Sequence, residues 1–119
     1  MAFSVRDTIY SIPSFYRADH MEGLRDLVMV YKIHDSGDQD GEYTVTIRNN
    51  EIGVRDGAAE NYTVRMLMTA KAYEAFTKGI FSPEVAFMTG DIRYIGNILA
   101  HEEMQKYLKI PKGTGIKYL

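Results

Sequence analysis

The residues of this chain that could do chemistry are few, and the first group lies in an acidic loop. Residues 36–41, Ser-Gly-Asp-Gln-Asp-Gly, match the opening of an EF-hand calcium loop, in which oxygen ligands at positions one, three and five precede a glycine at position six. Position twelve of such a loop is a glutamate that supplies two oxygens, but in this chain it is Ile47. The pattern therefore favours a solvated hairpin loop over a calcium site.

The histidines and hydroxyl residues do not complete a catalytic group either. His101 is followed by two glutamates, but no second histidine stands four residues along the chain, as the zinc-protease pattern requires. We expect His20 and His34 to be surface residues. The chain has no cysteine, and it contains neither the Gly-x-Ser-x-Gly elbow of hydrolases nor a phosphate-binding loop. The sequence therefore predicts no enzyme activity, no metal site and no cofactor.

The composition is that of one globular domain. Apolar residues make up 45% of the 119 residues and charged residues 25%, which argues against disorder. The formal net charge is −2, with Lys and Arg scattered singly, so we expect no nucleic-acid partner. No apolar run reaches the roughly 20 residues of a transmembrane helix, and no basic start followed by an apolar stretch marks a secretory signal. We expect a cytoplasmic protein without stable membrane insertion.

Alternation of apolar and polar residues with period two predicts a sheet. The alternation is clearest in residues 62–68, where Val64, Met66 and Met68 share one side of the strand. Residues 27–34 are apolar on both sides at their start, which indicates a central strand covered on two faces there. The expected strands are residues 27–34, 43–48, 52–55, 62–68 and 91–96.

Helical signals lie at both ends of the chain and between the last two strands. Ser4 can cap a first helix that ends at Pro13. A second helix begins after the fourth strand and stops at Gly79, in a position that favours a left-handed residue. Ser82, followed by a proline and a glutamate, signals a short third helix that Gly90 ends.

The last expected helix is amphipathic, because Ala100, Met104 and Leu108 follow one another at spacings of four. A tail over residues 110–119 completes a single domain that covers residues 1–119. The strands and helices together predict an α+β fold, in which a five-stranded, mainly antiparallel sheet is covered by helices on one face.

An ordered set of residues runs from the fourth expected strand to the fifth, and it comprises Met68-Thr69, Phe76, Gly79, Pro83, Ala86-Phe87-Met88, Gly90, Ile92 and Ile95-Gly96. No single match is specific, but in this order the set resembles the signature of the sterol carrier protein 2 (SCP2) lipid-binding domain. The resemblance extends over roughly residues 15–108. It implies an SCP2-like α+β fold that holds a fatty acid, fatty acyl-CoA, phospholipid or sterol in an apolar tunnel between sheet and helices, with the C-terminal helix as part of a lid.

The resemblance also implies which residues bind the ligand. On the helices expected to border the tunnel they are Phe76, Phe87, Met88, Met104 and Leu108; on the sheet they are Val64, Met66 and Met68, provided that their side of the strand faces the helices. Periodicity alone gives the same pattern for a packed core and for a lined tunnel, so the sequence leaves both open.

Two functions follow from the resemblance. The first is non-catalytic intracellular lipid binding or transfer. The alternative is an SCP2-like association or accessory module for a separate enzyme, with no bound lipid and with a possible homodimer. Asp91 and Arg93 stand where the family usually has lysines, and Asn97 replaces a common aspartate, so we do not expect a basic patch for an acyl-CoA phosphate.

Overall fold

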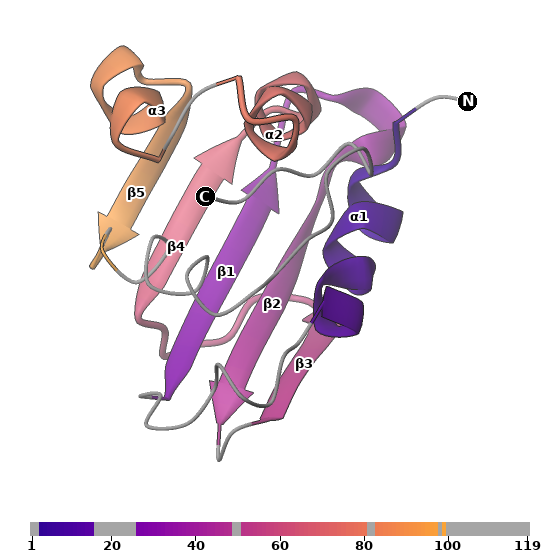
Figure 1. Cartoon of the computed structure of the whole chain (residues 1–119), viewed down its shortest axis with the longest axis vertical. Coiled ribbons are helices and arrows are strands. Elements are labelled where there is room, and N and C mark those ends of the chain that lie inside the picture. The colour runs from indigo at the N-terminus through magenta and orange to yellow at the C-terminus, as the bar shows by residue number, and fades with distance from the viewer. Residues whose placement is uncertain (1–2, 16–25, 49–50, 81–82, 98, 100–119) are drawn as a thin grey trace.

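The computed structural model describes residues 3–15, 26–48, 51–80, 83–97 and 99, and the structural statements below concern these residues (Figure 1). The five strands are β1 Leu27–Ile33, β2 Gly41–Arg48, β3 Glu51–Asp56, β4 Val64–Met68 and β5 Ile92–Gly96.

The strands form one sheet in the order β3-β2-β1-β4-β5. β1 pairs in parallel with β4, and the other neighbouring pairs are antiparallel. The predicted five-stranded, mainly antiparallel sheet is therefore confirmed, and each strand end lies within two residues of its predicted position.

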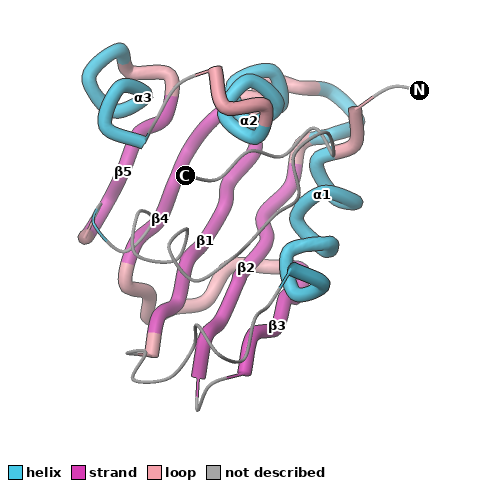
Figure 2. Tube along the Cα trace, in the orientation of Figure 1, coloured by secondary structure: helices cyan, strands magenta, loops and turns pink. Residues whose placement is uncertain are grey.

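Three helices lie over one face of this sheet (Figures 1 and 2). They are α1 Val5–Ser11, α2 Ala70–Thr77 and α3 Pro83–Thr89; short 3₁₀ turns cover Ile12–Phe15 and Gly37–Gln39. The start of α1 is capped as predicted, because the Ser4 hydroxyl oxygen accepts a hydrogen bond from the Asp7 N–H at 3.2 Å. The Thr69 hydroxyl oxygen caps α2 in the same way by accepting from the Ala72 N–H at 3.1 Å. The fourth predicted helix lies outside the described residues.

The core lies between the helices and one face of the sheet, which we call the helix-covered face. Tyr31 of β1 and Tyr73 of α2 are both buried there and meet edge to face, with ring centroids 5.9 Å apart. The buried side chains that this core shares are Val5, Ile9, Ile12, Leu27, Met29, Tyr31, Ile33, Tyr43, Val45, Ile47, Val64, Met66, Met68, Ala70, Tyr73, Phe76, Ala86 and Ile92. Removal of each large apolar side chain from water contributes roughly 1.5–3 kcal/mol, so this layer is the main source of stability.

The opposite face of the sheet, which we call the open face, is crossed by the chain between β3 and β4. This crossover is required because β3 is an edge strand, whereas β4 lies beyond β1. The Thr44 hydroxyl fixes its start by donating to the Gly57 carbonyl at 2.7 Å and accepting from the Ala59 N–H at 3.1 Å. Val30 and Thr44, which lie opposite each other on this face, are fully buried. The predicted covering of the central strand on two faces is therefore confirmed.

Gly96 ends β5 at a close backbone contact. Its φ of +101° lies in the region that L side chains rarely adopt, and a Cβ built on it would lie 2.5 Å from the Thr63 carbonyl oxygen. The same Thr63 carbonyl accepts a hydrogen bond from the Asn97 N–H at 2.9 Å. A side chain at position 96 would therefore push β5 away from the segment that leads into β4.

We expect Gly96→Ala to lower the free energy of unfolding by about 1–3 kcal/mol, because it adds both backbone strain and a steric clash. Gly53→Ala is the matched control, since a Cβ on Gly53 of β3 meets nothing within 4 Å and its φ is not positive. Urea unfolding of both variants measures the difference. Equal midpoints for the two variants would contradict the close-contact argument.

Candidate functional site

The three residues of β4 that were predicted to bind ligand lie on the helix-covered face. Val64, Met66 and Met68 are buried, with exposed fractions of at most 1%. In the parallel register they pair with Met29, Tyr31 and Ile33 of β1, which lie on the same face. The sequence analysis required that this side of the strand face the helices, and in the structure it does.

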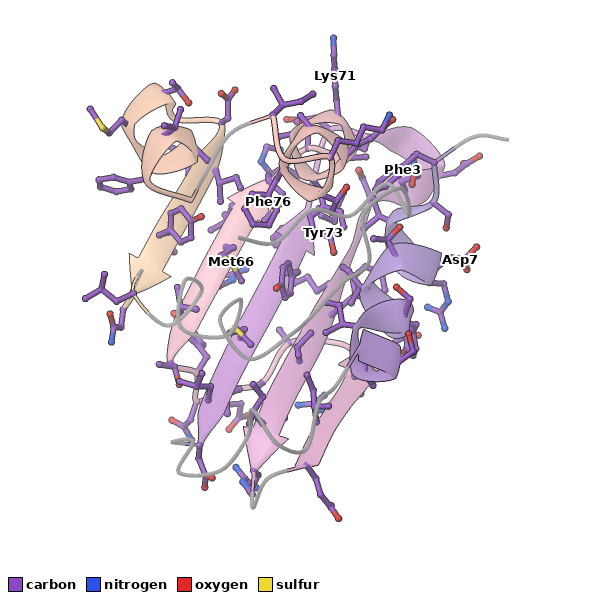
Figure 3. The ribbon with its side chains drawn as sticks, viewed as in Figure 1. Phe3, Asp7, Met66, Lys71, Tyr73 and Phe76 are labelled. Carbon is purple, nitrogen blue, oxygen red and sulfur yellow. The ribbon has the colours of Figure 1, made fainter. Side chains whose placement is uncertain are left out.

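Phe76 lies on the inward side of α2 and is also buried. In Figure 3, Phe76 and Tyr73 point from α2 toward the sheet, in the direction of Met66, while Lys71 points away from it. Helical spacing explains this arrangement, since residues three apart lie on one side of a helix. The aromatic side chains of α2 therefore cover the helix-covered face near β1 and β4.

Helix α3 buries its small apolar residue and exposes its larger ones. Its small residue, Ala86, is fully buried, whereas Val85, Phe87 and Met88 are 45%, 55% and 82% exposed. The Phe87 ring lies 6.1 Å from the Tyr94 ring of β5, measured between centroids, and so joins the exposed apolar surface of α3 to β5. The predicted binding residues therefore occupy two environments: those of β4 and α2 lie inside the core, and those of α3 lie outside it.

The sequence could not settle which side of α3 faces the sheet. Seven residues make about two turns, and in such a short helix apolar residues at neighbouring positions fit either orientation. The remaining predicted binding residues, Met104 and Leu108, lie outside the described residues.

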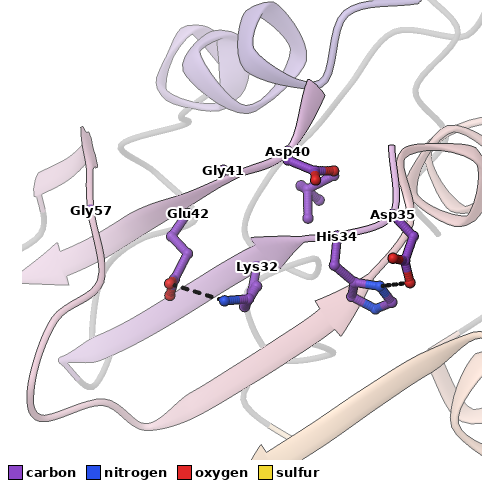
Figure 4. A pocket seen from close by; sticks show the side chains of 8 residues that line it. Lys32, His34, Asp35, Asp40, Gly41, Glu42 and Gly57 are labelled. Atoms are coloured by element: carbon purple, nitrogen blue, oxygen red, sulfur yellow. Dashed lines mark hydrogen bonds and ion pairs between the residues drawn. The ribbon is translucent and has the colours of Figure 1, made fainter. Parts of the chain in front are cut away.

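A polar groove with a volume of about 550 Å³ lies on the open face, beside the loop that joins β1 to β2 (Figure 4). Within it Lys32 Nζ lies 3.5 Å from Glu42 Oε1, and His34 Nδ1 lies 2.9 Å from Asp35 Oδ2. Arg65 Nη2 approaches the other oxygen of Glu42 at 3.5 Å. Glu42 of β2 therefore lies between a cation of β1 and a cation of β4.

The acidic loop at residues 36–41 joins two antiparallel strands, which confirms the predicted hairpin. Asp40 Oδ1 accepts a hydrogen bond from the Ser36 N–H at 2.6 Å, and the Ser36 hydroxyl donates to the His34 carbonyl and accepts from the Ala70 N–H. These polar groups hold the loop and attach it to the start of α2. Among the described residues, no three His, Asp or Glu side chains lie close enough together to hold a metal ion.

A second polar cluster attaches α1 to the edge strand β3, and sequence periodicity gave no signal for it. Asp56 Oδ1 accepts hydrogen bonds from the Tyr10 hydroxyl at 2.5 Å and from Arg6 Nη1 at 2.8 Å. The Tyr10 hydrogen bond, followed by that of Arg6, lowers the pKa of Asp56 below its ordinary value of 3.8. The same contact with Asp56 raises the pKa of Tyr10 above 10.0. The shifts move both groups away from neutral pH, so the cluster is structural and does not suit acid–base catalysis.

Comparison with known proteins relates this geometry to a known fold. No family model and no curated protein match the chain. Two structures of the sec-alkylsulfatase Pisa1, an enzyme from Pseudomonas sp., match with TM-scores of 0.81 and 0.78 at 15% and 14% identity. They align with 93% and 97% of this chain, but the chain spans only 17% and 18% of their length.

Structures of SCP2 proteins and domains match over most of both chains. Palmitated SCP2L2 from Aedes aegypti has a TM-score of 0.63 at 18% identity and is aligned over 87% of this chain and 93% of its own. The sterol carrier protein domain of Helicoverpa armigera has a TM-score of 0.59 at 17% identity, over 89% and 87%. The chain therefore has an SCP2-like fold, as its sequence predicted. None of its described helices is long and apolar enough to span a bilayer.

The Asp56 cluster predicts a pH dependence of stability. Because the folded-state pKa of Asp56 is lowered, its contribution is present above the ordinary aspartate pKa of 3.8 and is lost as the pH falls through the lower folded value. We expect Asp56→Asn to lower the unfolding midpoint in urea at pH 7, and we expect this difference from the wild type to shrink below pH 4. Asp38→Asn, at an exposed carboxylate of the β1–β2 loop, is the control. A difference that stays constant with pH would contradict the assignment.

Proposed function

We propose that this protein binds a hydrophobic ligand without catalysis, most simply a fatty acyl chain, and carries it between other cellular components in the cytoplasm. The orientation of α3 is the observation that carries the proposal. A helix that buries its alanine and exposes Phe87 and Met88 leaves apolar surface in water beside the core, and covering that surface with an apolar ligand is favourable.

In this proposal the ligand lies in an apolar tunnel between the sheet and the helices. Val64, Met66, Met68 and Phe76 form its inner wall, Phe87 and Met88 form its outer wall, and Met104 and Leu108 contribute from the C-terminal segment. Methionine suits such a site, because its flexible, polarisable side chain adapts to different apolar shapes. Each methylene removed from water contributes roughly 0.8 kcal/mol, so an acyl chain is held with few polar contacts.

The comparisons support the class of ligand. The Aedes aegypti protein is described as palmitated, and other matching structures are sterol carrier proteins. Fatty acid, acyl-CoA, phospholipid and sterol are all compatible with an apolar wall. Of these, acyl-CoA is the least favoured by the acidic residue at position 91.

An accessory role beside a separate enzyme is the second candidate function. It is favoured by one observation, namely that the same fold forms a part of a much longer sulfatase chain. In that role the domain would act by association with its enzyme and would hold no lipid.

Native mass spectrometry of the freshly purified protein, followed by organic extraction, separates the two functions. We expect a stoichiometric mass excess that extracts as a fatty acid or phospholipid. An apo mass that takes up no added fatty acid would contradict lipid binding and would favour the accessory role.

Phe87→Asp tests the proposed wall. Because Phe87 is about half exposed, we expect the substitution to lower the free energy of unfolding by less than about 1 kcal/mol. We expect at least a tenfold loss of fatty-acid affinity, because a carboxylate in an apolar site is costly. Tyr62→Asp is the matched control, since Tyr62 is an exposed aromatic residue of the crossover. Fluorescent fatty-acid titration and urea unfolding measure both quantities; equal affinities in the two variants would contradict the role of Phe87.

A further inference from the structure

The loop between β1 and β2 holds the first N–H group of two helices. The Gln39 side-chain oxygen Oε1 accepts a hydrogen bond at 2.8 Å from the N–H of Val5, the first residue of α1. The Ser36 hydroxyl oxygen accepts a hydrogen bond at 2.8 Å from the N–H of Ala70, the first residue of α2. The first N–H groups of a helix have no partner within the helix, so both helix starts depend on this loop.

The caps that belong to the helices themselves act on different N–H groups. Ser4 accepts from the Asp7 N–H, and Thr69 accepts from the Ala72 N–H. In each helix this N–H lies two residues beyond the one that the loop holds. Each helix start is therefore held twice, once by its own preceding residue and once by the loop, and substitution can remove either contribution by itself.

Hydrogen bonds within the loop join Ser36 and Gln39 into one unit. The Gln39 N–H donates to the Ser36 carbonyl at 3.2 Å, and the Ser36 N–H donates to Asp40 Oδ1 at 2.6 Å. The Ser36 hydroxyl donates to the His34 carbonyl at 2.9 Å, which fixes the unit to the end of β1. A displacement of Ser36 therefore displaces Gln39, so the loop links the start of α1 to the start of α2.

A ring contact lies beside this link. Phe3, which precedes α1, and Tyr73 of α2 have ring centroids 6.1 Å apart (Figure 3). Packing therefore also joins the two helices. The contribution of the loop has to be separated from that of the rings by variants that leave both rings in place.

The proposed inner wall is closed by the protein's own side chains. Val64, Met66 and Met68 of β4 and Phe76 of α2 are at most 4% exposed. Closely packed side chains leave no room for an acyl chain, so a ligand contacts this wall only when α2 moves away from the sheet.

We propose that Ser36 and Gln39 are positioning residues that couple α1 to α2, so that both helices loosen from the sheet together when a ligand enters the apolar layer. The ligand part of this inference rests on the proposed function, whereas the coupling is measured without any ligand. α2 carries the proposed binding residue Phe76, and α1 carries none of the proposed binding residues. A change in ligand uptake when the loop's hold on α1 is removed is therefore a result that a local role of Gln39 would not produce.

Ser36→Ala tests the coupling by hydrogen exchange, measured by mass spectrometry of peptic fragments of the full chain. The substitution removes a hydrogen bond to α2, and we expect amide exchange to become roughly fivefold faster over residues 70–77 and also over residues 5–11. Thr69→Ala is the matched control, because it removes a hydroxyl at the start of the same helix and leaves the loop intact. We expect Thr69→Ala to speed exchange over residues 70–77 alone, and Ser36→Thr, which keeps the hydroxyl, to retain the wild-type rates.

Gln39→Leu tests the coupling from the side of α1. It removes the acceptor of the Val5 N–H, and we expect the association rate constant of cis-parinaric acid, a fluorescent fatty acid, to rise roughly fivefold in stopped-flow mixing. Ser4→Ala loosens the start of the same helix without changing the loop and should leave this rate constant unchanged. Gln39→Glu keeps an acceptor oxygen and should retain the wild-type value. Circular dichroism checks the fold of each variant.

Two exchange results would overturn the proposal. The first is faster exchange in α2 alone for Ser36→Ala. The second is an equal increase over residues 5–11 for Ser36→Ala and Thr69→Ala, which would assign the coupling to packing between the helices. An unchanged association rate constant in Gln39→Leu would overturn the ligand part. A wild-type protein that binds no cis-parinaric acid would contradict the proposed function, and the exchange rates would still decide whether the loop couples the two helices.

Discussion

The parallel pairing of β1 with β4 is the constraint on which the rest of the structure depends. Parallel strands cannot be joined by a tight hairpin, so the chain must leave the sheet after β3 and cross it before β4. The crossover occupies the open face, where the Thr44 hydroxyl holds it and Val30 is buried beneath it. The helices thereby lie on the other face, and most of the large apolar side chains of the strands, including Ile92 of the edge strand β5, are directed there.

Because the apolar side chains gather on the helix-covered face, the two clusters of charged side chains lie on the open face and at the β3 edge, where they join one element to another. On the open face Glu42 is shared between Lys32 and Arg65, and at the β3 edge Asp56 is held by Arg6 and Tyr10. Each carboxylate joins neighbouring elements: Glu42 contacts β1 and β4, and Asp56 contacts α1. The proposed ligand binding therefore depends on the apolar layer.

Within that layer, α2 and α3 differ in which of their apolar side chains they bury. α2 directs Tyr73 and Phe76 into the core and closes it, whereas α3 approaches β5 through Ala86 and leaves its larger apolar residues outside. A small residue allows the helix to lie close to the strand, and its larger neighbours are then left partly or largely exposed. Exposed apolar surface of this kind costs free energy in water, so it is retained most readily where a partner or ligand covers it.

The sequence by itself determined the strands, the start of α1 at Ser4, the end of α2 near Gly79 and the α+β class, because these depend on local periodicity, capping and backbone preference. It also placed β4 correctly, since the alternation over residues 64–68 puts Val64, Met66 and Met68 on one side and is broken only by Leu67. Only the tertiary structure decided that α3 buries Ala86 and exposes Phe87, and that Asp56 joins α1 to β3. Those outcomes depend on contacts between segments far apart in the chain, and a two-turn helix carries too little periodicity to specify its own inward side.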